Sequence, residues 1–332
     1  MKERVKTLFN LFIRVGLSGI LLAFIFSRID LHKTQQVLIS ADLGYVWMAL
    51  GIFCFINGLL VSRWFLFMRA VGLNVPVFSA VRYFFIGLFG NLFLPSSIGG
   101  DIIKVLGLCR ETSQKPAVVA SVLLDRLSGF AAIVIVAVST FTFGSLFGVV
   151  NDIRLALPIA LIAFLSIGVA FLLFNEKIYR LGCRLFGFFP KLRIKIMEMH
   201  GDILLLRRHW RLGAAAIALS CFSQMCYSMT FYLTALALHH PVPLVYCLIF
   251  VPLICVSASV PSIGGLGVRE AGAAYLFSRI GVSSEIAVSM SLVSFLFMVI
   301  LGLLGGAIYV LTLSYRRIQC PAPDAGVVRT IR

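Results

Sequence analysis

Long runs of apolar residues, separated by short polar connections, dominate this chain. Six of these runs lie at about 8–28, 44–63, 122–148, 156–174, 213–237 and 286–313. Each comes close to or exceeds the roughly 20 apolar residues that a helix needs to cross the hydrocarbon core of a bilayer. The pattern therefore predicts an all-α polytopic membrane protein with about six full spans.

Two further apolar runs are interrupted before they can span a bilayer. Residues 80–94 lead into the segment Pro95, Ser96, Ser97, Ile98, Gly99, Gly100 and Asp101, and residues 243–260 lead into Pro261, Ser262, Ile263, Gly264, Gly265, Leu266 and Gly267. Pro and Gly at this density end a helix. We therefore expect a re-entrant or broken helix at each of these two sites.

The two interrupted segments match each other from the proline to the second glycine, apart from one extra serine in the first. Each follows an apolar run, precedes charged residues, and lies at a corresponding place in halves of about 1–150 and 156–315. Paired broken helices in two halves are typical of secondary transporters, where they meet near the bilayer midplane. An alternative is that the glycines only let helices pack closely.

Composition agrees with a membrane protein, because 60% of the 332 residues are hydrophobic and only 13% are charged. The mean hydropathy is +1.03. A soluble domain has roughly twice that charged fraction. The net charge of +16 would indicate nucleic acid in a soluble chain, but here the basic residues first mark topology, since cytoplasmic loops collect Lys and Arg. We predict no nucleic-acid partner.

The distribution of basic residues predicts the orientation of the chain. The segment 175–212 carries nine bases against three acids, together with apolar side chains. It is expected to be cytoplasmic and to lie along the membrane surface. Alternation from this segment places both termini in the cytoplasm, including a short basic tail at 316–332. Only four bases then fall in outside loops, and four lie within or at the edges of apolar segments. The remaining bases, including Arg63, fall in loops assigned to the cytoplasmic side.

Charged residues near the interrupted segments are the candidate site. Three are acids and three are bases: Asp101, Asp125, Glu270, Lys104, Arg126 and Arg269. A charge near the bilayer centre costs at least about 2.5–3.5 kcal/mol, so each must find a partner or water. They form either buried ion pairs that set helix register or a site for an anionic head group, aided by main-chain N–H groups. In either case the three acids can neutralise the three bases.

Several kinds of chemistry have no motif in this chain. There is no GxxxxGK[ST] phosphate loop, and no His or Cys spacing typical of a metal site. The eight cysteines contain no CxxC pair. No histidine lies in either interrupted segment to activate Ser96, Ser97 or Ser262. We therefore expect neither a metal, a cofactor nor a catalytic residue.

Three segments together resemble a known family. These are Phe84 to Asp101 with its Leu-Pro-Ser-Ser-Ile-Gly-Gly-Asp ending, Leu123-Leu124-Asp125-Arg126-Leu127, and Val260 to Glu270. In this order they resemble the membrane domain of lysylphosphatidylglycerol synthases, which belongs to a wider flippase-like group. The resemblance covers about 10–315 and implies one membrane domain over 1–315 that translocates lipids across the cytoplasmic membrane.

Two-domain members of that family also carry a soluble aminoacyltransferase domain. Because only 19 residues follow Leu313, we expect a stand-alone member without that activity. The resemblance thus implies movement of a lipid with an anionic or sugar-bearing head group. Two alternatives are a non-transporting accessory protein that recruits a lipid-biosynthetic enzyme through 175–212, and an enzyme that uses Asp101, Asp125 or Glu270 as general base. Small residues in the last span leave a homo-oligomer open.

Overall fold

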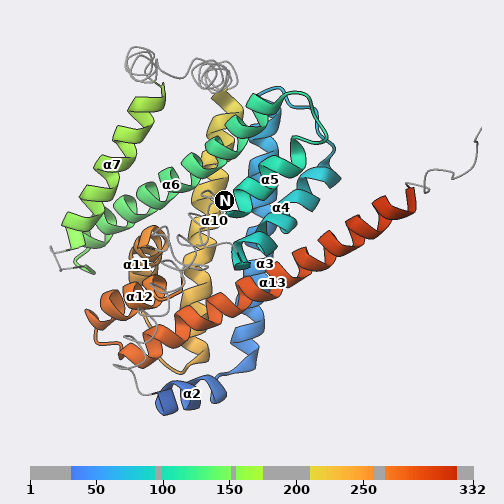
Figure 1. The fold of residues 1–332 in the computed structure, drawn as a ribbon. Helices are drawn as coiled ribbons and strands as arrows, with labels where there is room; N and C mark the ends of the chain where they lie inside the picture. The colour runs from blue at the N-terminus through green and yellow to red at the C-terminus, as the bar shows by residue number, and fades with distance from the viewer. Residues whose placement is uncertain (1–30, 94–98, 151–154, 175–209, 258–265, 320–332) are drawn as a thin grey trace, which may run out of the picture.

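The computed structural model describes residues 31–93, 99–150, 155–174, 210–257 and 266–319, and its regular elements there are all α-helices (Figure 1). They are α2 (Leu31–Ile39), α3 (Leu43–Ala70), α4 (Val77–Phe93), α5 (Gly99–Leu108), α6 (Lys115–Leu146), α7 (Ala156–Phe174), α10 (Trp210–Ala237), α11 (Leu244–Ser257), α12 (Val268–Ser278) and α13 (Ser284–Gln319). The expected span at 8–28, nearly all of 175–212 and most of the tail lie outside the described residues. The all-α class predicted from the apolar runs is confirmed.

Four of the described helices are long and apolar enough to cross a membrane: α3, α6, α10 and the part of α13 from Ser284 to Thr312. They coincide with predicted spans, although α3 and α6 are longer than expected. The segment expected at 156–174 forms α7, with nearly the same bounds. Asp42 begins α3, because its side chain accepts a hydrogen bond from the Gly44 N–H. At the other end α3 continues past the predicted limit to Ala70, because Trp64 to Met68 are still apolar.

Helices α3 and α10, each 28 residues long, pack along each other at the centre of the bundle. The Asp42 N–H, just before α3, donates to the Ala237 carbonyl at the end of α10, at 2.8 Å. Near the opposite end, Arg63 of α3 donates to Ser220 of α10. The two helices are therefore antiparallel.

The first interrupted segment lies between two helices that fold back on each other. Gly107 of α5 faces the Tyr83 ring on α4, and Gly100 faces Gly87 and Asn91 farther along α4. A Cβ atom at Gly100 would lie 2.2 Å from the Gly87 carbonyl oxygen, so no larger residue fits without a shift. Helices α4 and α5 thus form a re-entrant hairpin, as the sequence predicted. Residues 94–98, between these two helices, are not described.

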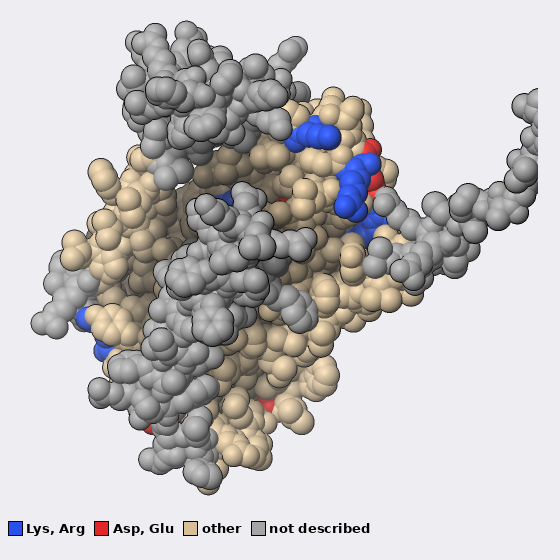
Figure 2. Space-filling model, in the orientation of Figure 1, with Lys and Arg blue, Asp and Glu red and all other residues tan. Residues whose placement is uncertain are grey.

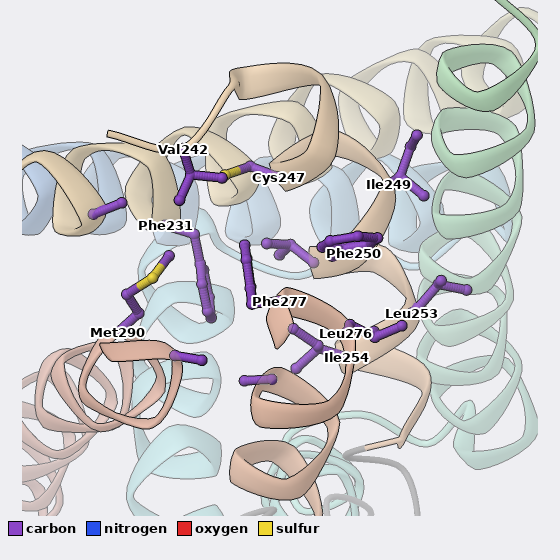
Figure 3. Packing of buried hydrophobic residues seen from close by; sticks show 14 of the residues in the cluster. Phe231, Val242, Cys247, Ile249, Phe250, Leu253, Ile254, Leu276, Phe277 and Met290 are labelled. Carbon is purple, nitrogen blue, oxygen red and sulfur yellow. The ribbon is translucent and has the colours of Figure 1, made fainter. Parts of the chain in front are cut away.

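The helices on either side of the second interrupted segment, α11 and α12, form a matching hairpin. The Phe250 ring of α11 meets the Phe277 ring of α12 edge to face, 5.3 Å between centroids, and Phe277 stacks on Phe231 of α10 (Figure 3). Near the tip, Gly272 of α12 lies against Ser257 of α11. These aromatic contacts belong to the largest buried apolar cluster among the described residues. They hold the second hairpin against the central helices.

The two sets of helices correspond in order and in partners. Helices α3, α4, α5 and α6 repeat as α10, α11, α12 and α13, and the first helices of the two sets, α3 and α10, are antiparallel. Each long final helix packs on the hairpin of the other set, α13 on α4 and α6 on α11. The described helices therefore show the inverted repeat that the two breaks predicted.

The glycines of the last span pack inside the molecule. Gly302, Gly305 and Gly306 of α13 lie directly against α4, where an added Cβ at Gly305 would meet the Phe85 carbonyl oxygen at 2.0 Å. This contact accounts for the small residues that had left a homo-oligomer open. It gives them a role within one chain.

Much of the described surface is apolar. Figure 2 shows a face with few charged residues, which gather mainly near one end of the molecule. Large side chains such as Leu157, Phe164 and Ile167 of α7 expose two thirds or more of their area. An apolar surface of this extent indicates a membrane environment.

Candidate functional site

The carboxylate of Asp101 binds two basic side chains. Asp101 lies in the first turn of α5, and Lys104, one turn later on the same helix face, approaches its Oδ1 with Nζ at 3.4 Å. Arg126 of α6 donates from Nε to the other carboxylate oxygen. Asp101 and Lys104 are both buried. Asp101 therefore joins the re-entrant hairpin to the long helix α6.

Lys104 lies among aromatic rings. Its Nζ is 4.4 Å from the centroid of Phe84 and 5.5 Å from that of Trp64. A ring face attracts a cation at such distances. Lys104 Nζ therefore lies between the Asp101 carboxylate and the faces of these two rings.

A second ion pair joins Asp125 to Arg63, which the distribution of basic residues assigns to a cytoplasmic loop. Arg63 of α3 donates from Nε to Asp125 Oδ1 at 2.6 Å, and both side chains are only 9% exposed. Its Nη1 also donates to Ser220 of α10, which in turn donates to Ser128 of α6. The loop assignment of Arg63 was wrong, because α3 continues past it. The continuing apolar run was the signal that it stays in the bundle.

The third ion pair lies at the start of α12. Gly267 precedes this helix with φ of 87°, a conformation that glycine adopts without strain, and its N–H donates to Glu270 Oε2 at 2.7 Å. The other oxygen, Oε1, accepts from Arg269 Nη2 at 2.8 Å and from the Ser291 hydroxyl of α13 at 3.0 Å. Glu270 is 1% exposed. It therefore positions both Arg269 and the beginning of α12.

These three clusters meet around one cavity of about 390 Å³ between the two sets of helices. Five of the six predicted charged residues line it, and Arg63 is an additional one; the charged lining is Arg63, Asp101, Lys104, Asp125, Arg126 and Arg269. Glu270 is not part of the wall and lies behind Arg269. The uncharged polar lining is Asn57, Asn91, Ser220, Ser223, Gln224 and Tyr227, and the apolar lining includes Phe53, Phe84, Leu88, Phe130 and Met298.

Arg63 changes the charge balance that the sequence predicted. With Glu270 included, the described residues of the site hold four bases and three acids, a formal excess of one positive charge rather than none. Such a site attracts an anion.

Three of the predicted glycines lie in the described part of the motifs. Gly99 and Gly100 begin α5, and the Gly100 N–H donates to the Asn91 side chain at 2.9 Å. Gly267 precedes α12. The predicted residues outside the described part are Pro95, Ser96, Ser97, Pro261, Ser262, Gly264 and Gly265. Among the residues that the structure describes, no group of three or more His, Cys, Asp or Glu side chains is arranged to hold a metal ion.

Comparison with known proteins identifies the family. The model of the lysylphosphatidylglycerol synthase transmembrane region matches residues 11–306. The chain belongs to this family. It is also 23% identical over 306 residues to the UPF0104 membrane protein PH1989 of Pyrococcus horikoshii, an alignment that covers 85% of this chain and 90% of that protein. As a member of the lysylphosphatidylglycerol synthase transmembrane family, the protein is a membrane protein, and the cavity lies within the part that defines the family.

Proposed function

We propose that this protein moves a lipid with an anionic or sugar-bearing head group across the cell membrane. The observation that carries the proposal is the charged cavity between two re-entrant hairpins, inside a bundle whose outer surface is apolar. A lipid head group needs a polar path through the bilayer, because polar groups lose water at a large cost in hydrocarbon. The cavity supplies charged and hydrogen-bonding groups for such a path.

The mixed lining of the cavity supports an amphiphilic substrate. Charged groups and amides lie beside the rings of Phe53, Phe84 and Phe130. A small polar solute would gain nothing from those rings, whereas the glycerol and first methylene groups of a lipid bury apolar area against them. The partners in this proposal are therefore membrane lipids.

Transport is favoured over head-group chemistry because both carboxylates that line the cavity are engaged by bases. Asp101 binds Lys104 and Arg126, and Asp125 binds Arg63. In the described part of the cavity, neither lies beside a nucleophile that it would activate.

We place the protein in the cytoplasmic membrane with both termini in the cytoplasm, on the basis of the basic residues in the expected inside loops.

Reconstitution in liposomes tests the proposal. Vesicles would contain head-group-labelled phosphatidylglycerol, and an impermeant quencher would report how fast the inner-leaflet label reaches the outside. We expect faster exposure with the protein than in empty vesicles. We also expect at least about a tenfold loss of that rate in Arg126→Ala and Arg269→Ala, since contacts to a buried charge contribute roughly 2 kcal/mol or more.

The matched control is Arg110→Ala, because Arg110 is an exposed base away from the cavity. It should keep the wild-type rate, and all variants should elute as single species on gel filtration. A panel of anionic, polyprenyl-linked and glycosylated lipids, with and without a proton gradient, would follow a negative result. No movement of any of these lipids would refute the proposal and favour an accessory role.

A further inference from the structure

The carboxylate of Asp101 occupies a position suited to the phosphate of a lipid. It lies between Lys104 Nζ and Arg126 Nε, and two cationic donors on either side of an anion form a typical phosphate-binding arrangement. Arg126 has a side chain that is 38% exposed, against 9% or less for Arg63, Lys104 and Arg269. Of the four bases that line the cavity, Arg126 is therefore the one that an entering head group reaches most easily.

The other two acids of the site are less available for exchange. Asp125 is held by Arg63 in a pair of which both side chains are 9% exposed. Glu270 is held by the Gly267 N–H, the Ser291 hydroxyl and Arg269 at once. Asp101 in contrast spans two bases, of which one is partly exposed. An incoming anion would thus displace Asp101 more readily than the other two.

We infer that the phosphate of a monoanionic phosphodiester lipid takes the place of the Asp101 carboxylate between Lys104 and Arg126. Asp101 is then an internal competitor, which neutralises the two bases while the cavity holds no lipid. This inference rests on the proposed function and names the class of lipid and the place of its phosphate.

Charge and hydrogen bonding favour this class of lipid. The described residues of the site carry a formal excess of one positive charge, and a phosphodiester carries one negative charge at neutral pH. A phosphomonoester would bring a second charge, and a zwitterionic head group would bring a cation toward four bases. The lining also includes Ser220, Ser223 and Gln224 of α10, which are polar and uncharged. Hydroxyl groups on the lipid head group would form hydrogen bonds with these side chains.

Binding of short-chain lipids to the purified full-length protein in a non-ionic detergent tests the inference. The probe is dihexanoyl-phosphatidylglycerol, and the Kd is measured by isothermal titration calorimetry. Asp101→Asn should lower the Kd about tenfold or more, because it removes the competing charge and keeps the side-chain size. Arg126→Gln should raise the Kd by a similar factor. Arg110→Gln, at an exposed position, should leave it unchanged.

Three further probes define the ligand. Dihexanoyl-phosphatidylcholine reports on a zwitterion, dihexanoyl-phosphatidic acid on a monoester, and glycerophosphoglycerol on the same phosphodiester without acyl chains. We expect phosphatidylglycerol to bind more tightly than all three. Equal binding of glycerophosphoglycerol would show that the site takes a soluble phosphodiester, and tighter binding of phosphatidic acid would contradict the preference for a monoanion. Either result overturns the inference.

Failure of this inference can be told from failure of the proposed function. If lipid moves in vesicles but Asp101→Asn binds phosphatidylglycerol no more tightly than the wild type, competition by Asp101 is refuted and transport stands. If no lipid moves but Asp101→Asn binds tenfold more tightly, the phosphate site stands and transport is refuted. Should Asp101→Asn not fold, Arg126→Gln and Arg126→Lys decide: loss of binding with Gln and recovery with Lys supports the site, and equal loss in both refutes it.

Discussion

At the scale of single residues, the Arg63–Asp125 pair shows how a charge is held within an apolar bundle. The two residues are 62 positions apart in sequence and belong to α3 and α6, and Ser220 of α10 completes the network. A buried pair is costly to break, because removal of one partner leaves the other charge uncompensated. The pair therefore fixes how three helices lie relative to one another.

Arg63→Met should lower the stability of the purified protein by about 3–5 kcal/mol, because Asp125 would lose its counter-ion. The double substitution Arg63→Met with Asp125→Leu should recover much of this loss, since it leaves no buried charge. Urea or thermal unfolding in detergent, followed by tryptophan fluorescence, measures both. If the loss in the double variant equalled the sum of the losses in Arg63→Met and in Asp125→Leu alone, the two residues would not interact energetically.

At the scale of elements, α4 is packed on two sides through glycines. Gly100 and Gly107 of α5 let that helix approach one side, and Gly302, Gly305 and Gly306 of α13 let the last helix approach another. These contacts bring the glycine backbone close to backbone, to an aromatic ring or, at Gly302, to the Leu92 side chain. The hairpin that carries Asp101 and Lys104 is therefore positioned by shape rather than by polar bonds alone.

Gly305→Ala should destabilise the protein by about 1–3 kcal/mol, because the new methyl group would overlap the Phe85 carbonyl and force α13 away from α4. The matched control is Gly51→Ala in α3, where no atom lies within 4 Å of the added Cβ. That control should be neutral, or stabilising by up to about 1 kcal/mol through helix propensity. The melting temperatures of the two variants give the comparison, and a Gly305→Ala protein as stable as Gly51→Ala would exclude close packing of α13 on α4.

At the scale of the whole molecule, the order of the helices predicts which connections face each side of the membrane. The beginning of α3 lies beside the end of α10, as the Asp42–Ala237 hydrogen bond shows. The loop between α5 and α6, at 109–114, follows the re-entrant hairpin. If the bundle spans the membrane in the proposed orientation, Ser40 faces outside and Ser113 faces the cytoplasm.

Cysteine labelling in cells tests this orientation. In a background without native cysteines, Ser40→Cys should react with an impermeant maleimide in intact cells, and Ser113→Cys should react only after lysis. Both serines are exposed, so a reagent that reaches their side of the membrane should label both. The reverse pattern would invert the proposed topology, and labelling of both positions in intact cells would contradict a span between them.

The sequence by itself determined the class of fold, the positions of most of the long apolar helices, the two interruptions, and six of the seven charged residues that the structure joins in ion pairs around the cavity. These features depend on local composition, because apolar length decides which segments enter a bilayer and Pro and Gly decide where helices stop. Charges in apolar runs stand out for the same reason. A repeated motif could be found by comparing the chain with itself.

Only the tertiary structure decided which charges pair and which of them face the cavity. The distribution of basic residues assigned Arg63 to a cytoplasmic loop, but it lies in α3 and pairs with Asp125 on another helix. Glu270 follows the second interrupted segment as Asp101 ends the first, so the two acids looked equivalent. In the structure Asp101 lines the cavity, whereas Glu270 lies behind Arg269. No local pattern encodes such contacts, because they depend on how helices distant in sequence pack and on which face of each helix meets its neighbour.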